Sequence, residues 1–416
     1  MKKLLLATLS VALVVAVIIA AGSNVAFAAE QQTNQTSEYY QFMSDFISNC
    51  RDRYGYDREL KAAQYLADKF DALLSGTDAE ANILTYGSEQ TAQTGNVVVK
   101  LNAQNPKTEN SGAQIIIGAH YDAESDGAND NASGVAALYF VMSKLLDNYA
   151  NLPCNVVFIA FGGEERGLLG SYYYVSEMSS AERQNTLLMI NIDSIVNGDN
   201  LYLFCENKST SLAKLILQND KSGAISEKPY AKGTYSTMDM YGYGYYETIQ
   251  GSDYTPFRLQ NIPTAFFFSG NFVGWDYVES TDSNKVTMNS SRDTLENLLA
   301  TGADIEGRID SVVTSIVGTV CDEQFISTVE NARSELINNA VLFNPWWPRL
   351  IAFGILIILA VLAFFYYRKL QKQSILGTAE IKQNSVFDKP QAEDIFSFDN
   401  KQTDKNDVDD IFTFKK

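Results

Sequence analysis

Histidine is almost absent from this chain, since His120 is the only one among 416 residues. A single imidazole excludes sites built from several histidines, and it argues against a two-zinc hydrolase, which normally uses a second one. Cysteine is scarce too, and the four residues contain no CxxC pair or close spacing, so they predict neither a cysteine zinc site nor a disulfide framework. An even number still permits disulfides, but Cys154 and Cys205 border apolar runs and are expected to be buried thiols.

Basic residues are outnumbered by acidic ones. The chain has 32 Lys and Arg against 50 Asp and Glu, which gives a formal net charge of −18. This balance argues against nucleic acid and anionic surfaces as partners, because both repel a negative protein. A basic substrate or bound cations remain compatible with it.

The N-terminus is typical of a secretory signal peptide over residues 1–28. Lys2 and Lys3 precede an apolar run over 4–21, and the small residues of Ala26-Phe-Ala28 fit cleavage before Ala29. The run is long for a signal peptide, so an uncleaved anchor helix is the alternative interpretation.

A second apolar stretch predicts a transmembrane helix over residues 346–367. Its uncharged part, 350–367, is long enough to cross about 30 Å of hydrocarbon, and Trp and Tyr pairs stand at its two ends. The basic residues that follow it indicate a cytoplasmic C-terminus. We therefore expect an extracellular domain over 29–344 that ends in a helical stalk, and a disordered cytoplasmic tail over 368–416.

The extracellular part alternates apolar strands with helices. Strands are expected over 96–101, 114–119, 155–161, 187–192, 201–205 and 264–268, and helices over 36–50, 57–74, 133–148, 168–176 and 293 to about 340. Continuous apolar strands are typical of a parallel sheet that is buried on both faces. The predicted fold class is therefore α/β, with three layers: a mostly parallel central sheet with helices on both faces, plus the C-terminal transmembrane helix.

Potential metal ligands follow several of these strands. His120, the Glu164-Glu165 pair and Asp193 each come at the carboxyl end of an apolar strand, where ligands bind in open α/β sheets. Asp130 lies in a Gly- and Asn-rich turn at a helix start, where its carboxylate can reach a neighbouring strand end. Imidazole and carboxylates suit zinc, and two adjacent glutamates suit one metal ligand and one general base.

Taken together, the motifs resemble the co-catalytic zinc aminopeptidases of metallopeptidase family twenty-eight. The resemblance spans residues 40–300, and it is carried by the segments His120-Tyr-Asp122, Gly127-Ala-Asn-Asp-Asn-Ala-Ser-Gly134, Glu164-Glu-Arg-Gly-Leu-Leu-Gly-Ser171, Asn191-Ile-Asp193, Ser252-Asp-Tyr-Thr-Pro-Phe257 and Asp293-Thr-Leu-Glu-Asn297.

The resemblance implies a role for each matching residue. His120 and Asp193 would bind one zinc, Asp130 would bridge two metals, and Glu165 would bind the second. Glu164 would be the general base, and Asp122 would hydrogen-bond the far nitrogen of His120 and fix its tautomer. The fold implied is of the zinc-exopeptidase type.

The chain departs from the family pattern at the second zinc. The family usually has a histidine four residues before the Asp-Thr pair, where this chain has Asn289, and Tyr254 replaces another common histidine. An asparagine carbonyl suits magnesium, calcium or manganese better than zinc. One zinc is therefore expected, the second stays open, and Asp282 is a substitute ligand in reach of the same segment.

The expected function is a membrane-anchored, extracellular, metal-dependent exopeptidase that acts on peptides, most simply an aminopeptidase. The alternative is a catalytically impaired ectodomain that binds peptides like a receptor. A third interpretation, a one-zinc relative of the glutaminyl cyclases, is disfavoured because Asn289 removes that zinc's histidine. A purely structural membrane protein does not explain ligand-type residues at several strand ends.

Two further features have no assigned role. The tyrosine- and glycine-rich segment over 226–252 is either a surface loop or an aromatic wall beside the substrate pocket. The tail repeats an acidic-aromatic motif at Asp394–Phe398 and Asp410–Phe414, which suggests a docking peptide for a cytoplasmic partner, although a biased composition produces such repeats as readily.

Overall fold

The computed structural model describes residues 37–87, 94–205, 210–229, 251–273, 276–277, 288–343 and 346–383. The predicted signal peptide, most of the tyrosine-rich segment, Asp282 and both tail motifs lie outside these residues. The chain divides into two compact units, Met1–Phe343 and Asn344–Lys416, which are considered separately.

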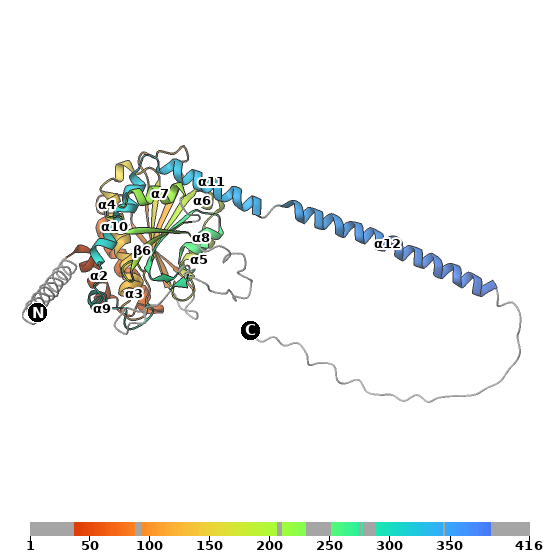
Figure 1. The fold of residues 1–416 in the computed structure, drawn as a ribbon, viewed down its shortest axis with the longest axis horizontal. Coiled ribbons are helices and arrows are strands. Elements are labelled where there is room, and N and C mark those ends of the chain that lie inside the picture. Colours follow the sequence, from red (N-terminus) through yellow and green to blue (C-terminus); the bar gives the residue numbers. More distant parts are fainter. Residues whose placement is uncertain are drawn as a thin grey trace, which may run out of the picture. The chain divides into compact units, whose positions relative to one another are not determined.

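An eight-stranded mixed sheet forms the centre of the first unit (Figure 1). Its strand order is β1-β2-β4-β3-β5-β8-β6-β7. In chain order the strands are β1 (Ala81–Tyr86), β2 (Thr94–Leu101), β3 (Gln114–His120), β4 (Asn155–Phe161), β5 (Thr186–Ile192), β6 (Asn200–Cys205), β7 (Ile225–Pro229) and β8 (Thr264–Gly270). A separate pair, β9 (Phe272–Val273) and β10 (Asp276–Tyr277), is antiparallel.

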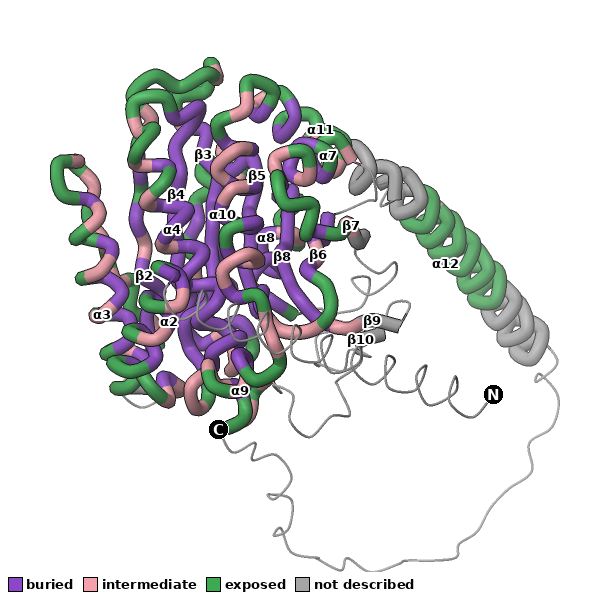
Figure 2. Tube along the Cα trace, turned by 60° about the vertical axis from the view of Figure 1, so that its left-hand side comes forward, coloured by how far each residue is buried: buried purple, intermediate pink, exposed green. Residues whose placement is uncertain are grey.

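The four central strands, β4, β3, β5 and β8, are parallel, as their continuous apolar runs predict. Every residue in them is buried (Figure 2). Antiparallel pairing begins outside this group, where β2 joins β4 and β6 joins β8. The sheet is therefore parallel at its centre and mixed overall, so the carboxyl ends of the central strands lie at one edge.

Helices cover both faces of the sheet (Figure 1). The elements in chain order are α2 (Glu38–Asn49), α3 (Tyr56–Leu73), η1 (Ala128–Ser133), α4 (Gly134–Leu146), η2 (Tyr149–Asn151), α5 (Leu169–Glu177), α6 (Ser180–Asn185), α7 (Ser211–Gln218), α8 (Tyr254–Leu259), α9 (Leu295–Ala300), α10 (Ile305–Cys321) and α11 (Phe325–Phe343).

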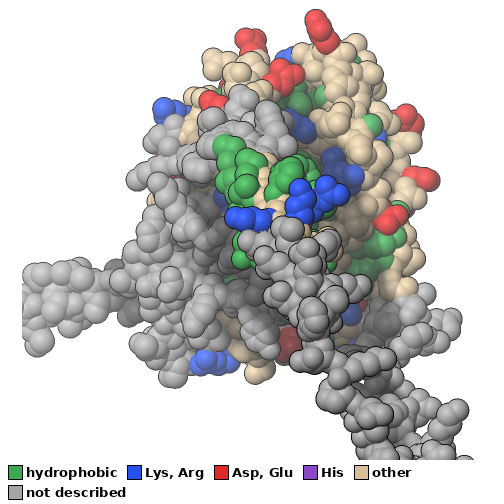
Figure 3. Space-filling model, turned by 90° about the vertical axis from the view of Figure 1, so that its right-hand side faces the viewer, with side chains coloured by type: hydrophobic (Ala, Val, Ile, Leu, Met, Phe, Trp, Pro, Cys, Tyr) green, Lys and Arg blue, Asp and Glu red, His purple; other side chains and the backbone are tan. Residues whose placement is uncertain are grey.

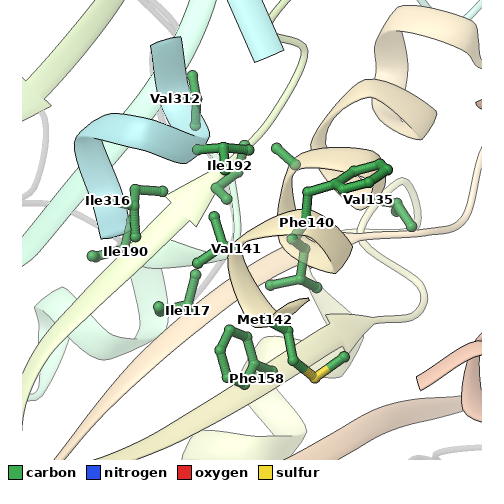
Figure 4. Packing of buried hydrophobic residues seen from close by; sticks show 14 of the residues in the cluster. Ile117, Val135, Phe140, Val141, Met142, Phe158, Ile190, Ile192, Val312 and Ile316 are labelled. Carbon is green, nitrogen blue, oxygen red and sulfur yellow. The ribbon is translucent and has the colours of Figure 1, made fainter. Parts of the chain in front are cut away.

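Alternation along the strands divides the core into two layers. On β3, Ile115 and Ile117 point into the larger layer, while Ile116 points into the smaller one. The larger layer packs under α4 and α10, where Val312 and Ile316 lie beside the residues of β5 (Figure 4). Each fully buried aliphatic or aromatic side chain contributes about 1.5–3 kcal/mol, so this layer holds the strand ends in place.

Local sequence signals set the helix starts. Ser37 caps α2 by accepting a hydrogen bond from the backbone N–H of Tyr40. Ser179 and Glu182 form a capping box at α6. This short helix was not predicted from the sequence. The strand β1 was not predicted either, because none of its residues is fully buried and it shows no apolar run.

The four cysteines are all free thiols; Cys50, Cys154 and Cys205 are buried and Cys321 is exposed. The expectation of buried thiols at Cys154 and Cys205 is therefore confirmed. Burial raises the pKa of Cys154 to about 12, which makes it an inert packing residue.

The described part of the second unit is one helix, α12 (Trp346–Gln383). Its stretch Ile351–Lys372 is long and apolar enough to cross a membrane by length and composition. The helix continues past Tyr367 to Gln383, so residues 368–383 are helical where disorder was expected. Lys, Leu and Gln are good helix formers, and extending an existing helix avoids the cost of a new nucleus.

Acidic side chains are scattered over the face drawn in Figure 3, as the excess of acidic over basic residues predicts.

Candidate metal centre

Neighbouring strands deliver two predicted ligands to one edge of the sheet. His120 was expected directly after β3 and is instead its last residue. Asp193 directly follows β5. Because β3 and β5 are adjacent and parallel, their carboxyl ends meet. Both side chains are buried, with 1% and 7% of their surface exposed.

The imidazole of His120 faces two carboxylates. Its Nε2 lies 3.1 Å from Oδ1 of Asp130 and 3.3 Å from Oδ1 of Asp193. One ligand atom from each of the three residues lies within 4.8 Å of the others. Two ligands that each lie 2.0–2.1 Å from a tetrahedral zinc are separated by roughly 3.3 Å. The donor set and its spacing therefore fit one zinc ion.

The other ring nitrogen fixes the tautomer. Nδ1 of His120 lies 3.2 Å from the backbone carbonyl oxygen of Asp122, which can only accept, so Nδ1 carries the hydrogen and Nε2 keeps its lone pair for a metal. The carboxylate of Asp122, which was expected to make this contact, is 3.6 Å from Nδ1, beyond hydrogen-bond distance.

The carboxylate of Asp122 instead organises the glutamate pair. It accepts hydrogen bonds from the backbone N–H groups of Glu164 at 3.0 Å and Glu165 at 3.1 Å. The sequence suggested that Asp122 orients His120. Its backbone carbonyl oxygen does contact the ring, and its carboxylate orients the loop after β4.

The turn that carries Asp130 is held by Asp293. The carboxylate of Asp293 accepts hydrogen bonds from the backbone N–H groups of Asn129 at 2.7 Å and Asp130 at 2.9 Å. The peptide bond between Asp130 and Asn131 is cis. Asp293 was noted in the sequence only as part of a motif, and its contact gives it a positioning role.

The two asparagines beside Asp130 join this turn to the loop after β5. Asn131 donates to the carbonyl oxygen of Ile192 and accepts from the N–H of Ser194, while Asn129 accepts from the N–H of Val196. An amide side chain can donate and accept at once. Both roles were missed in the sequence, where the Gly- and Asn-rich composition indicated only a turn.

Asp193 has its own support. The hydroxyl of Ser252 donates to Oδ2 of Asp193 at 2.7 Å, and the amide of Asn191 donates to the oxygen of Ser252 at 2.6 Å. These two hydrogen bonds leave Oδ1 of Asp193 facing His120. Ser252 belongs to a motif quoted from the sequence, but nothing in that pattern assigned its contact.

Burial and neighbouring charges shift the pKa values of all three ligands. Burial lowers the pKa of His120, but the carboxylates of Asp193 and Glu164 outweigh burial and raise it well above its usual value. Burial favours neutral Asp193, yet the imidazole reverses the effect and lowers its pKa. Burial raises the pKa of Asp130, and the neighbouring imidazole of His120 opposes this effect.

Three more carboxylates border this centre. Loss of water raises the pKa of Glu164 well above its usual value, with Asp253 and Asp193 adding to the effect, although His120 opposes it. Burial and then Asp130 raise the pKa of Glu165 to about 9, and its Oε1 has no hydrogen-bond partner among the described residues. Such an excess of carboxylates around one imidazole favours a bound cation.

Asp253 was not assigned a role from the sequence. It is fully buried, and burial raises its pKa to about 7. Neither of its oxygens has a hydrogen-bond partner of standard geometry among the described residues. The hydroxyl of Ser171 is near enough to lower the pKa of Asp253, but it donates to the carbonyl oxygen of Leu168.

Asn289 is exposed and has a left-handed backbone, with φ of 54°. It lies four residues before Asp293, which ties this segment to the turn of Asp130. Glu165 is not in the group of His120, Asp130 and Asp193. The alternative ligand Asp282 lies outside the described residues.

The chain is similar to known proteins. A model of peptidase family M28 matches residues 96–311. The chain is 35% identical over 152 residues to the alkaline phosphatase isozyme conversion protein of Escherichia coli, covering 29% of this chain and 43% of that protein. It is 28% identical over 205 residues to the probable lipoprotein aminopeptidase LpqL of Mycobacterium tuberculosis, covering 47% and 39%.

The chain spans less than half the length of these curated relatives. Among solved structures, LapA of Legionella pneumophila aligns with a TM-score of 0.51 at 18% identity, over 72% of this chain and 75% of that one. This likeness shows a shared fold. The family match covers just over half of the sequence, and the chain therefore belongs to peptidase family M28.

Proposed function

We propose that the protein is a membrane-anchored, zinc-dependent aminopeptidase. The observation that carries the proposal is the group of His120, Asp130 and Asp193, whose ligand atoms lie within 4.8 Å of one another beside a pair of glutamates. Zinc held there supplies Lewis acidity towards a peptide carbonyl and a nucleophile at neutral pH. One such ion is the minimum that the proposal requires.

Glu164 is proposed as the general base. Its raised pKa makes its carboxylate a stronger proton acceptor than an ordinary glutamate, and a base works best when its pKa is near the operating pH. Asp122 fixes the backbone of Glu164 and Glu165 through two hydrogen bonds to its carboxylate. Glu164 then takes the proton from the attacking water and returns it to the leaving amine.

Glu165 is proposed to hold a second, weaker cation together with Asp130. Support comes from its unpartnered Oε1 and from the influence of Asp130 on its pKa. Asn289 replaces the histidine that the family resemblance leads one to expect, so we expect this second ion to bind less tightly than the first.

The proposed topology follows the two apolar segments. Residues 1–28 direct export, residues 29–344 form the extracellular catalytic unit, and residues 346–367 span the membrane. The span in α12 supports membrane attachment by length and composition, and the basic residues after it favour a cytoplasmic C-terminus. Residues 384–416 and their repeated motif remain a proposed docking site for a cytoplasmic partner.

Hydrolysis of aminoacyl-nitroanilides by the purified full chain tests the proposal. Glu164→Gln should lower kcat by about 10²–10⁴-fold, because it removes the base and keeps the shape, while the zinc content stays unchanged. The control is Glu177→Gln, which changes an exposed glutamate at the end of α5. A Glu164→Gln protein with the wild-type rate would remove Glu164 from this role.

The replacement of histidine by Asn289 favours one second candidate, a peptide-binding ectodomain without turnover. This candidate predicts that the zinc-loaded wild type binds peptides in a titration but does not hydrolyse them. Hydrolysis that disappears in Glu164→Gln would reject it.

A further inference from the structure

Two charged residues that precede the region matched to the family are buried beside the candidate metal centre. Arg53 lies in the link between α2 and α3, and Glu59 lies in the first turn of α3. Both are fully buried, with 0% of their surface exposed. The match to the family begins only at residue 96. Buried charges are costly unless they are fully hydrogen-bonded, so their partners indicate what they do.

Arg53 closes the loop between His120 and Asp130. Its Nε donates to the carbonyl oxygen of Tyr121 at 2.5 Å, and its two terminal nitrogens donate to the carbonyl oxygens of Asp126 at 2.6 Å and Gly127 at 2.9 Å. Tyr121 directly follows His120, and Gly127 is three residues before Asp130. The planar fork of arginine is suited to hold several acceptors in one fixed arrangement.

The backbone around Arg53 reinforces the same loop. The N–H of Asp52 donates to the carbonyl oxygen of Ser125 at 2.6 Å, and the N–H of Ala123 donates to the carbonyl oxygen of Arg53. The guanidinium also stacks on the ring of Phe46, with 4.7 Å to the ring centroid. Among the described residues Arg53 has no ion pair, so its side chain is satisfied by this loop and not by a carboxylate.

Glu59 holds the loop of the glutamate pair. Its Oε2 accepts from Arg166 at 2.7 Å and from the N–H of Gly55 at 3.1 Å, and its Oε1 accepts from the hydroxyl of Thr94. Arg166 directly follows Glu165. At the other end of the same loop, Gly162 packs so close to Glu59 that an added Cβ would lie 2.8 Å from Oε1.

We propose that Arg53 and Glu59 are positioning residues for the two halves of the centre: Arg53 sets the loop that joins His120 to Asp130, and Glu59, through Arg166, sets the loop of Glu164 and Glu165. The catalytic unit therefore includes the helical segment before the family-matched region. This inference rests on the proposed function only where it predicts an effect on hydrolysis. The contacts of Arg53 and Glu59 with the two loops do not depend on that function.

Hydrogen exchange on the full chain in detergent separates the two roles. Arg53→Lys keeps the positive charge but loses the fork, so backbone exchange should rise over residues 121–130 and not over 162–167. Glu59→Gln keeps the size but loses the charge that holds Arg166, so exchange should rise over 162–167 and not over 121–130. A role in general stability alone would raise exchange in both loops and in the central strands equally.

Zinc affinity and kinetics give the second readout. We expect Arg53→Lys to weaken zinc binding by about tenfold or more, and Glu59→Gln to lower kcat by about tenfold while zinc binding changes little, which are losses typical of residues that orient a metal site. The matched controls are Arg58→Lys and Asp57→Asn, which change exposed residues of the same helix turn. The side chain of Arg58 bonds the Asp52 carboxylate and the Tyr54 carbonyl, and neither of these groups belongs to residues 121–130 or 162–167.

The outcomes are distinct. Loop-selective exchange with weakened zinc binding in Arg53→Lys supports the proposal, and exchange that matches the controls or rises uniformly overturns it. If the wild type binds zinc but hydrolyses nothing, the proposed peptidase function fails. The exchange and zinc measurements then still decide whether Arg53 and Glu59 position the two loops.

Discussion

The hydroxyl of Ser252 donates a 2.7 Å hydrogen bond to Oδ2 of Asp193, while the other oxygen of Asp193 faces Nε2 of His120 at 3.3 Å. Each oxygen of this carboxylate thus has one task. Ser252 fixes the carboxylate plane, and the amide of Asn191 in turn fixes Ser252. Supports of this kind determine how well ligands are placed before any ion binds.

Removal of that support should weaken the site. Ser252→Ala is expected to lower zinc affinity by about 10–100-fold, measured by competition with a chelator of known affinity. Ser176→Ala is the matched control, because its hydroxyl is exposed and, among the described residues, bonds only the carbonyl oxygen of Tyr173. Equal affinities for the two variants would contradict the role given to Ser252.

Restoring a histidine should restore the second ion. Asn289→His is expected to raise the zinc content of the purified protein from near one towards two equivalents, measured by elemental analysis. The backbone at 289 has φ of 54°, and both Asn and His tolerate this region better than most residues, so the variant should fold normally. An unchanged zinc content would mean that residue 289 does not face the ion.

Stability of the metal-free protein should depend on Asp253. Burial raises the pKa of Asp253 from 3.8 to about 7, so between these values the folded state binds more protons than the unfolded state. The contribution of this group to stability is present at low pH and is lost as the pH rises through about 7. Asp253→Asn removes this loss.

Thermal unfolding in the presence of a chelator measures the effect. The Tm of the wild type should fall relative to that of Asp253→Asn as the pH is raised from 5 to 8. Above pH 8 the difference in Tm between the two proteins should stay constant. Parallel curves for the two proteins over this range would show that Asp253 does not carry the raised pKa.

The larger core layer should be sensitive to truncation. Phe158 on β4 is fully buried in it, and Phe158→Ala is expected to lower the free energy of unfolding by about 3–5 kcal/mol. Leu84→Ala on the edge strand β1 is the control, because 40% of Leu84 is exposed. Similar shifts in Tm for the two variants would contradict the packing described.

Membrane attachment should reside in the second unit. A chain that ends at Phe343 is expected to appear in the soluble fraction, whereas a chain that ends at Gln383 and keeps α12 should stay in the membrane pellet. Fractionation at alkaline pH measures this. A truncated protein that remains in the pellet would indicate instead that the apolar N-terminal segment is an uncleaved anchor.

Much of the fold was predictable because the central strands are continuous apolar runs. β4 has the expected bounds, and β3 and β5 differ from them by one residue. Because these strands are buried on both faces, their apolar residues are continuous and do not alternate with polar ones. The edge strand β1 and the helix end at Gln383 were not predictable in this way, because neither depends on a run of buried residues.

The candidate site was predictable in its ligands more than in its supports. His120 and Asp193 are close in space because they lie at the ends of adjacent parallel strands, and Asp130 reaches them from the turn η1. Zinc binding by this group stays a prediction. Arg53 and Glu59 were missed because charged residues at a helix start normally face water. Only the packed structure shows that these two are buried, and no local pattern carries that information.

The solitary imidazole has a practical consequence. A sample labelled with nitrogen-15 histidine gives ring signals from one residue alone, so the spectrum reports the tautomer of His120 directly and without assignment. Titration with zinc would then follow the occupancy of this one position in the intact membrane protein, independently of any substrate.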